Sequence, residues 1–243
     1  MPIVRLRKCT PDTILSVRST LSNAIHTMSA PAFTTNVVVF TLRDDSLRAL
    51  LVRRGTAPFK SMWALPGGHL EAEEDLDASA MRALEEGTGV TGVYLEQLYT
   101  FGRPDRDPRR RTIALCYFAL IPSERLQLRA AVDAEGVGWF ALDELPSLAF
   151  DHAEMVEVAR QRLSAKLAYS TIALQFMPER FTLSELQSVY EAILDEKLDK
   201  RNFRKRINAL EQVEETPELR RNGSHRPARL YRARNPGEVQ IIR

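Results

Sequence analysis

The stretch from residue 67 to residue 90 constrains the fold of this 243-residue chain more than any other part of it. It opens with the pair Gly67-Gly68, where the backbone can adopt positive φ or approach a ligand closely, although a plain tight turn needs glycine equally. An acidic turn with Glu71, Glu73 and Glu74 follows. The pattern after it predicts a helix from about Leu76 to Glu86, which Gly87 and Gly89 end.

The spacing within this stretch resembles the Nudix box of enzymes that hydrolyse a nucleoside diphosphate linked to another group. The matching residues are Gly68, Glu74, Arg82, Leu84, Glu86, Gly89 and Val90. The resemblance implies an α/β/α sandwich. It also implies that carboxylates at three helix positions after the arginine hold Mg²⁺ or Mn²⁺ and activate a water molecule.

In this chain those three positions are Ala83, Glu86 and Gly87. Residues spaced i, i+3 and i+4 share one helix face, so three carboxylates there can converge on one hard cation. Glu86 alone keeps a carboxylate, and Glu85 lies about 100° away around the helix. We therefore expect no catalytic residue and no metal site. Glu86 is then interpreted as a helix partner of Arg82, and the acidic turn as a solvated loop or a weak metal site.

Alternating and β-branched runs predict a sheet around the box. Two strands joined by a turn at Asp44 to Ser46 precede it, and the segment from Trp63 to Gly68 is interpreted as the approach to a loop. The predicted strands are Thr35 to Leu42, Leu47 to Arg53, Val93 to Phe101, Thr112 to Leu120 and Gly136 to Phe140. The chain therefore belongs to the α/β class, with a mixed sheet and helices packed against it.

Five arginines occupy a loop between two of these strands, from Gly102 to Arg111. Guanidinium groups bind phosphates through paired hydrogen bonds, so this loop is a candidate phosphate site, with a solvated loop as the alternative. The residues that we expect to bind a ligand are Arg54, Trp63, Gly67, Gly68, Arg82, Glu86, Arg103, Arg106, Asp107 and Arg109.

The length and the composition, 44% apolar and 27% charged, are typical of a globular protein with two domains. Asp151 and Glu154 predict the start of a helix with one apolar face, which closes the first domain. We expect the boundary between Lys166 and Pro178. The predicted division is a flexible leader over residues 1–31, a ligand-sensing domain over 32–170 and a second domain over 171–243.

The second domain contains two capped helices. Thr182 and Glu185 form a capping box for the first helix, and Asp199 caps the second. Phe203, Ile207 and Leu210 line one face of the second helix, and basic residues point away from that face. This arrangement predicts a helix-turn-helix whose second helix enters the major groove of DNA.

A basic hairpin follows, because Asn222-Gly223 is a strong turn signal and Pro227 confines its strand to an edge. We interpret it as a wing. Residues 199–234 hold eleven basic and five acidic side chains, a net charge of +6. We interpret the basic side chains of the wing as available to DNA phosphates. They include Arg220, Arg221, His225, Arg226, Arg229 and Arg232. The residues that we expect to bind DNA are Lys200, Arg201, Asn202, Arg204, Lys205, Asn208, His225, Arg226 and Arg229.

Together the two halves resemble the Nudix-related transcriptional regulators of NAD metabolism. The matching segments are residues 63–68, the altered box, residues 95–102 with 106–109, and residues 181–231. The resemblance implies a sensor of ADP-ribose or a related NAD metabolite that needs no cofactor. It also implies a homodimer that represses genes of NAD synthesis or salvage from a palindromic operator in double-stranded DNA.

Two cysteines, Cys9 and Cys116, provide no disulfide framework, which suits a reducing cytoplasm. No apolar run approaches the roughly 18 residues of a membrane span, and no signal peptide follows Met1. Two alternatives to the repressor stay open: an active Mg²⁺-dependent Nudix ADP-ribose pyrophosphatase with an appended nucleic-acid module, and a C-terminal module that docks proteins.

Overall fold

The structure is a computed structural model that describes residues 30–124, 136–221 and 227–242. Residues 1–29, most of the predicted leader, lie outside the described residues, as do Asn222, Gly223, His225 and Arg226. The elements of the first domain are β1 (Ala32–Arg43), β2 (Ser46–Arg53), β3 (Trp63–Ala64), β4 (Gly67–His69), α2 (Leu76–Thr88), β5 (Tyr94–Phe101), β6 (Thr112–Ile121), β7 (Val137–Ala141), η2 (Leu142–Glu144) and α4 (His152–Leu167). The second domain contains η3 (Ile172–Phe176), α5 (Leu183–Leu194), α6 (Lys200–Ala209), β8 (Val213–Arg220) and β9 (Ala228–Ala233).

A mixed sheet with the order β3-β2-β1-β6-β5 forms the centre of the first domain, with β4 paired to β1 and β7 paired to β2. The pair β1/β6 is parallel, and the other pairs are antiparallel. The predicted strands are all present. β1 begins three residues earlier than we expected, because its parallel register with β6 starts at Ala32 opposite Thr112.

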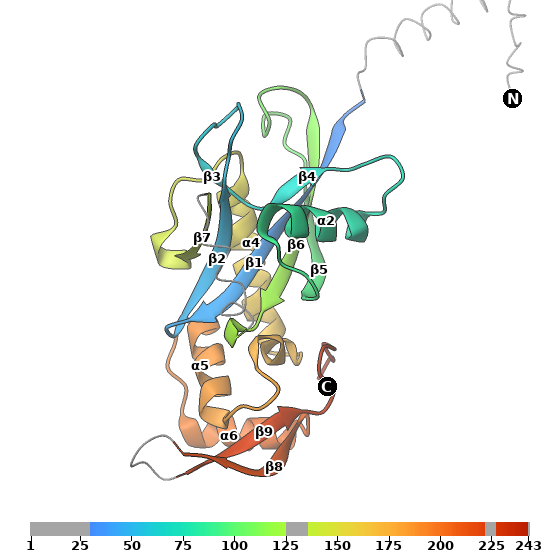
Figure 1. Cartoon of the computed structure of the whole chain (residues 1–243). Coiled ribbons are helices and arrows are strands. Elements are labelled where there is room, and N and C mark those ends of the chain that lie inside the picture. The colour runs from blue at the N-terminus through green and yellow to red at the C-terminus, as the bar shows by residue number, and fades with distance from the viewer. Residues whose placement is uncertain (1–29, 125–135, 222–226, 243) are drawn as a thin grey trace, which may run out of the picture.

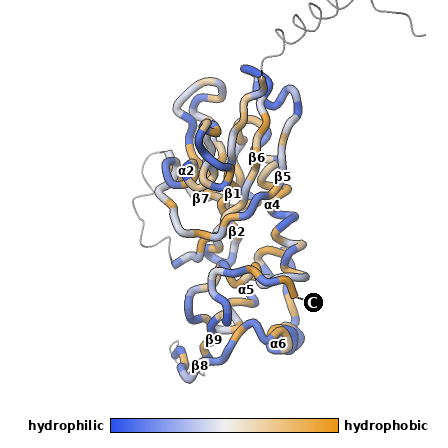
Figure 2. Tube along the Cα trace, turned by 90° about the vertical axis from the view of Figure 1, so that its right-hand side faces the viewer, coloured by the Kyte–Doolittle hydropathy of each residue, from blue (hydrophilic) through white to orange (hydrophobic). Residues whose placement is uncertain are grey.

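Alternation along β1 divides the core between the two faces of the sheet. Val37 and Val39 pack with Ala80 and Leu84 of α2, whereas Val38 and Phe40 share a core with the buried face of α4. Figure 1 shows α2 and α4 on opposite faces, and Figure 2 shows hydrophobic residues gathered along β1 and β6. The predicted α/β/α sandwich is therefore confirmed.

The segment from Trp63 to Gly68 is more regular than the expected loop approach. Trp63 and Ala64 pair with β2, and Gly67 and Gly68 pair with β1. A Cβ atom at Gly67 would lie 2.4 Å from the Asn36 amide nitrogen and 2.7 Å from the Thr35 carbonyl oxygen. Glycine is required at position 67 because the backbone of β4 passes this close to β1.

The helix of the box ends later than we predicted. Asp75 caps its N-terminus by accepting a hydrogen bond from the Ala78 amide at 2.7 Å, and Gly87 lies inside the helix. Gly89 ends it in the left-handed conformation at φ 69°, with its amide bonded to the Glu85 carbonyl oxygen. One glycine, not two, therefore provides the stop.

The second domain is a winged helix. Thr182 and Glu185 form the predicted capping box of α5, and Asp199 accepts a hydrogen bond from the Asn202 amide at 2.8 Å to cap α6. β8 and β9 pair antiparallel as the wing, while Phe181 bonds to Tyr231 of β9 through both backbone groups. Phe181, Leu186, Tyr190 and Phe203 belong to the same buried core as Val38 and Phe40 of the sheet.

Candidate functional site

Arg82 is the central side chain of the altered box. Its guanidinium donates to both carboxylate oxygens of Glu74, at 2.6 and 2.8 Å, to the His69 carbonyl oxygen at 3.0 Å and to Glu86 at 3.3 Å. These bonds fasten α2 to the loop after β4. The hydrogen bonds from Arg82 lower the pKa of Glu74 to about 2. Glu74 is thus an internal partner of the arginine, which corrects our expectation that the whole acidic turn is solvated or a weak metal site.

The box lacks the donor set that a divalent cation requires. Ala83 and Gly87 carry no donor atoms, and the Glu86 carboxylate forms the i, i+4 pair with Arg82 that the sequence predicted. In the part of the chain that the structure describes, no group of three or more His, Cys, Asp or Glu side chains is arranged to hold a metal. The side chains at these positions therefore do not fit the Mg²⁺ or Mn²⁺ that the fold implies.

A cavity of about 240 Å³ lies beside the box, and we call it the arginine cavity. Its lining comes from β1, β4, the segments that follow β2 and β3, the loop between β5 and β6, and the residues at and just before the start of α4. The lining residues are Thr34, Asn36, Arg54, Thr56, Leu65, Gly67, Gly68, His69, Arg106, Asp107, Arg109, Thr112, Phe150 and His152. Six of the ten predicted ligand residues are among them.

Arg106 is held in the wall of this cavity by a buried ion pair. Its Nε and Nη2 donate to the two Asp151 carboxylate oxygens at 2.9 and 2.7 Å, and the two side chains are 4% and 2% exposed. Asp151 precedes α4 but makes no side-chain capping bond to it, contrary to our expectation. The Asp151 carboxylate pairs with Arg106 rather than capping α4, because a buried guanidinium without a partner would cost far more free energy than an uncapped helix amide.

Two further guanidinium groups face the ring of Phe150. The centre of the Arg54 guanidinium lies 4.7 Å from the ring centroid, and that of Arg109 lies 5.9 Å away. Asp107 fixes Arg109 through bonds from Nε at 3.0 Å and Nη2 at 2.7 Å, and these bonds lower the pKa of Asp107 to about 2. Burial lowers the pKa of Arg54, and the charge of Arg109 lowers it further. An anion between the two groups would offset that repulsion.

Asn36 and His152 are cavity residues that sequence reasoning missed. His152 Nδ1 accepts a hydrogen bond from the Leu65 amide at 2.9 Å, which leaves the proton of the neutral ring on Nε2. The Asn36 side-chain amide lies 3.5 Å from Nε2 and accepts this proton when its oxygen faces the ring. Burial lowers the pKa of His152 to about 3. The signal in the sequence that could have indicated this pair was Asn36, because a side-chain amide at the start of an apolar strand needs a buried hydrogen-bond partner.

The other four predicted ligand residues lie outside the lining. Trp63 packs edge-on against Phe140 with 4.7 Å between ring centroids. Arg103 pairs with Glu154 at 3.3 Å, and Arg82 and Glu86 form the box contacts described above. Their role in ligand binding stays a prediction.

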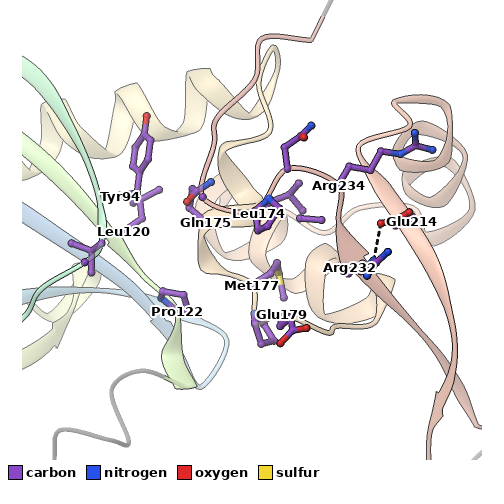
Figure 3. A pocket seen from close by; sticks show the side chains of 17 residues that line it. Tyr94, Leu120, Pro122, Leu174, Gln175, Met177, Glu179, Glu214, Arg232 and Arg234 are labelled. Atoms are coloured by element: carbon purple, nitrogen blue, oxygen red, sulfur yellow. Dashed lines mark hydrogen bonds and ion pairs between the residues drawn. The ribbon is translucent and has the colours of Figure 1, made fainter.

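A larger cavity of about 690 Å³ lies at the junction between the domains. Figure 3 shows Tyr94, Leu120 and Pro122 on the side of the sheet, and Glu214, Arg232 and Arg234 on the side of the wing. Arg232 donates to Glu214 at 2.7 Å across the hairpin. This lining is a mixture of apolar and polar residues from two domains, without the clustered guanidinium groups of the arginine cavity.

The exposed face of α6 carries the predicted recognition residues. Lys200, Arg201, Asn202, Arg204, Lys205 and Asn208 are all exposed, whereas Phe203 and Ile207 are buried. Arg206 differs from its neighbours, because its Nη2 donates to the Leu167 and Ala168 carbonyl oxygens at the end of α4, at 3.1 and 3.4 Å.

The arginines of the wing are less available than we expected. Arg229 pairs with Glu215, Arg232 with Glu214, and Arg220 with Glu185 of α5. Glutamates on β8 and α5 thus occupy arginines of the wing that we expected to contact DNA phosphates. His225 and Arg226 lie outside the described residues, and their role in DNA binding stays a prediction.

The fold and the site together define a class: proteins in which a Nudix-type sandwich with an altered box is fused to a winged helix. Comparisons with known proteins agree. The NUDIX domain model matches residues 32–159, and the model described as the NrtR DNA-binding winged helix domain matches residues 173–233. The chain belongs to the family of NrtR-type transcriptional repressors, which combine these two domains.

Three similar proteins illustrate this membership. The ADPR responsive transcriptional repressor NtrR of Acinetobacter baylyi is 40% identical over 207 residues, covering 84% of this chain and 82% of that protein. The crystal structure of Shewanella oneidensis NrtR with a 27mer DNA superposes with a TM-score of 0.76 at 37% identity, covering 83% and 93% of the two chains. The ADP-ribose pyrophosphatase of Methanocaldococcus jannaschii is 34% identical over 121 residues, covering 50% of this chain and 70% of that enzyme.

A search of the described residues for a helix long and apolar enough to cross a bilayer found none.

Proposed function

We propose that this chain is a transcriptional repressor that binds double-stranded DNA through its winged helix and responds to ADP-ribose or a related NAD metabolite in the arginine cavity. The observation that carries the proposal is the presence, in one chain, of paired guanidinium groups facing Phe150 and an exposed basic face on α6. The similarity to an ADPR responsive repressor supports the ligand, and the similarity to a protein crystallised with DNA supports the partner.

The chemistry of the cavity suits a pyrophosphate. Arg54 and Arg109 offer charge-assisted hydrogen bonds to phosphate oxygens, and both guanidinium groups face the Phe150 ring. Ala83 and Gly87, in place of carboxylates, reduce repulsion of an anion that binds without a metal. We place the sensor at residues 32–170 and the DNA-binding domain at residues 171–243. A homodimer of such chains would read two half-sites about one helical turn apart in a palindromic operator.

Fluorescence anisotropy of an operator duplex tests the response. The duplex is recovered by repeated selection from a randomised pool on the full chain, and it is then titrated with ADP-ribose. We expect the apparent operator affinity to fall roughly tenfold or more at saturating ligand, whereas adenosine, which has no phosphate for the arginines to bind, leaves it unchanged. Operator binding that is the same with and without ADP-ribose would exclude the sensor.

A variant of the cavity tests where the ligand binds. Arg109→Met should weaken ADP-ribose binding roughly tenfold in isothermal titration, because one charge-assisted contact to phosphate is lost. Arg110→Met is the matched control, since Arg110 is an exposed arginine of the same loop that does not line the cavity. Equal ADP-ribose affinities of the two variants would show that the ligand binds outside the arginine cavity.

We further propose that the Nudix-type domain has lost hydrolysis. The second candidate function, an active ADP-ribose pyrophosphatase, is favoured by the cluster of Glu74, Arg82 and Glu86 and by the similarity to the archaeal enzyme. Incubation of the full chain with ADP-ribose and Mg²⁺ or Mn²⁺, with AMP measured over time, separates the two. We expect AMP at background level, whereas turnover on the order of 1 per second would establish the enzyme.

A further inference from the structure

Three consecutive residues at and just before the start of α4 are connected to the arginine cavity: Phe150 and His152 line it, and Asp151 pairs with Arg106, which lines it. Phe150 faces Arg54 and Arg109, Asp151 holds Arg106 in a buried ion pair, and His152 accepts from the Leu65 amide beside Asn36. A ligand that moves these guanidinium groups must therefore act on the first turn of α4.

The opposite end of α4 is attached to the recognition helix. Nη2 of Arg206 donates to the carbonyl oxygens of Leu167 and Ala168, where the helix ends, at 3.1 and 3.4 Å. Unpaired carbonyl oxygens and the negative end of the helix dipole make this a favourable place for a cation. The guanidinium also lies 5.9 Å from the ring centroid of Tyr190, which packs edge-on against Phe203 of α6.

Between its two ends α4 is a stiff element inside one continuous core. Its sixteen residues span about 24 Å at 1.5 Å per residue. Met155, Ala159, Leu163 and Leu167 belong to the same buried core as the sheet, α5 and α6. Ser164 also donates to the Ile193 carbonyl oxygen of α5 at 3.1 Å. A close-packed helix of this kind moves as a unit rather than bending.

We propose that α4 transmits the occupancy of the arginine cavity to the DNA-binding face, and that Arg206 is the positioning residue that fixes α6 to the end of α4. Figure 1 shows α4 running from the cavity side of the sheet toward α5 and α6. This inference rests on the proposed function. It assigns to Arg206 a role different from that of Arg201, Arg204 and Lys205: all four residues are exposed, but Arg206 is bonded to the end of α4.

The coupling factor is the ratio of the operator dissociation constant with saturating ADP-ribose to the constant without it. This factor measures the positioning role of Arg206. By linkage the same ratio applies to ADP-ribose affinity with and without operator. Arg206→Met keeps an unbranched chain over Tyr190 but removes the donors to Leu167 and Ala168. We expect the coupling factor to fall from roughly tenfold or more to less than about threefold, while ADP-ribose binds the DNA-free variant with unchanged affinity.

Arg160→Met is the matched control, since Arg160 is an exposed arginine of α4 that pairs within the helix with Glu157 and does not reach α6. Its coupling factor should equal that of the unmodified chain. A coupling factor in Arg206→Met equal to that of the unmodified chain overturns the inference. A factor of one in the unmodified chain overturns the proposed function instead.

Hydrogen exchange of the unmodified chain provides a test that does not depend on a variant. Saturating ADP-ribose should change amide protection at the end of α4 and in α6, as well as around the cavity. Protection that changes at the cavity but stays the same in α6 would overturn the inference even if Arg206→Met failed to fold.

Discussion

At the scale of single residues, this chain uses charged side chains chiefly to hold its own parts together. Arg82 binds Glu74 and Glu86, Arg106 binds Asp151, and Arg109 binds Asp107. All of these pairs except Arg82–Glu86, which lies within α2, join separate segments or fix a loop in place. Asp107 holds the Arg109 guanidinium, and the Pro58 carbonyl oxygen accepts from Arg54 Nε at 3.0 Å, so both groups that face the Phe150 ring have internal partners before any ligand binds.

His152 should make the stability of the fold depend on pH. Its folded pKa of about 3 lies below the ordinary value, because burial disfavours the charged ring. Below pH ~6.5 the unfolded chain therefore binds a proton that the folded chain does not, and stability falls as pH decreases. We expect this histidine to cost about 2 kcal/mol between pH 7 and pH 5, measured as the free energy of unfolding in urea.

His152→Asn is the comparison for this measurement, since its side-chain oxygen can still accept from the Leu65 amide but cannot titrate in this range. The variant should show a shallower loss over the same interval. Glu74 and Asp107 do not interfere there, because their folded pKa values of about 2 place their loss of stability at lower pH. Parallel pH profiles of the two proteins would show that His152 already carries a proton in the fold.

The residue pairs that sequence reasoning missed are those distant along the chain. Arg106 and Asp151 are 45 positions apart, and Asn36 and His152 are 116 apart. Spacing on one helix predicted the Arg82–Glu86 pair, because a helix fixes which residues are neighbours. No such rule connects a loop arginine to the residue before α4, so local capping was the natural but incorrect interpretation of Asp151.

At the scale of elements, capping signals predicted the starts of both helices of the second domain. The capping box of Thr182 and Glu185 and the cap at Asp199 are both formed, because each needs only neighbours within three positions. The short strands β3 and β4 were missed, since they exist only through pairing with β2 and β1. The last two residues of α2, Gly87 and Thr88, were missed because Gly87 continues the helix and only Gly89 of the two glycines adopts the left-handed conformation.

The outer face of α6 should carry DNA recognition. Arg201→Ala and Lys205→Ala should each reduce operator affinity at least tenfold, because exposed cations that contact phosphates or bases are lost. Gel-shift titration at several salt concentrations measures both affinity and its salt dependence, and thermal melting confirms the fold. Full operator affinity in both variants would move recognition to another element.

The same titration distinguishes DNA from a protein partner of the winged helix. Phosphate contacts release counterions, so operator affinity should fall steeply as salt rises. Arg43→Ala is a suitable control, because Arg43 is exposed at the end of β1, distant in the sequence from α6, and pairs with Asp44. Operator binding that does not change with salt would favour a docking module.

At the scale of the whole molecule, the two domains share one core. The buried cluster that contains Val38 and Phe40 of β1 continues through α4 and η3 to Phe203 and Ile207 of α6. The segment after β9 also returns to the junction, where the Thr171 amide donates to the Gln240 carbonyl oxygen at 3.0 Å. The sequence predicted two domains and a boundary, but it contained no local signal that their cores would join.

Thermal unfolding should therefore be a single cooperative transition. Separation of the domains would expose the apolar faces of α4 and α5 at once, so neither half is expected to melt alone. Differential scanning calorimetry of the full chain measures this, with a calorimetric enthalpy equal to the van't Hoff enthalpy as the expected result. Two resolved transitions would show that the shared core is too weak to couple the halves.

The buried ion pair of Arg106 and Asp151 has a consequence for how such sequences can diverge. Loss of either charge alone leaves the other without its partner in a dry interior, at a cost of about 3–5 kcal/mol, which is a large part of the stability of an ordinary domain. A lineage can replace both residues with apolar side chains of similar volume, or it can keep both. Positions 106 and 151 should thus be inherited as one unit, although a helix start and a loop contribute them separately.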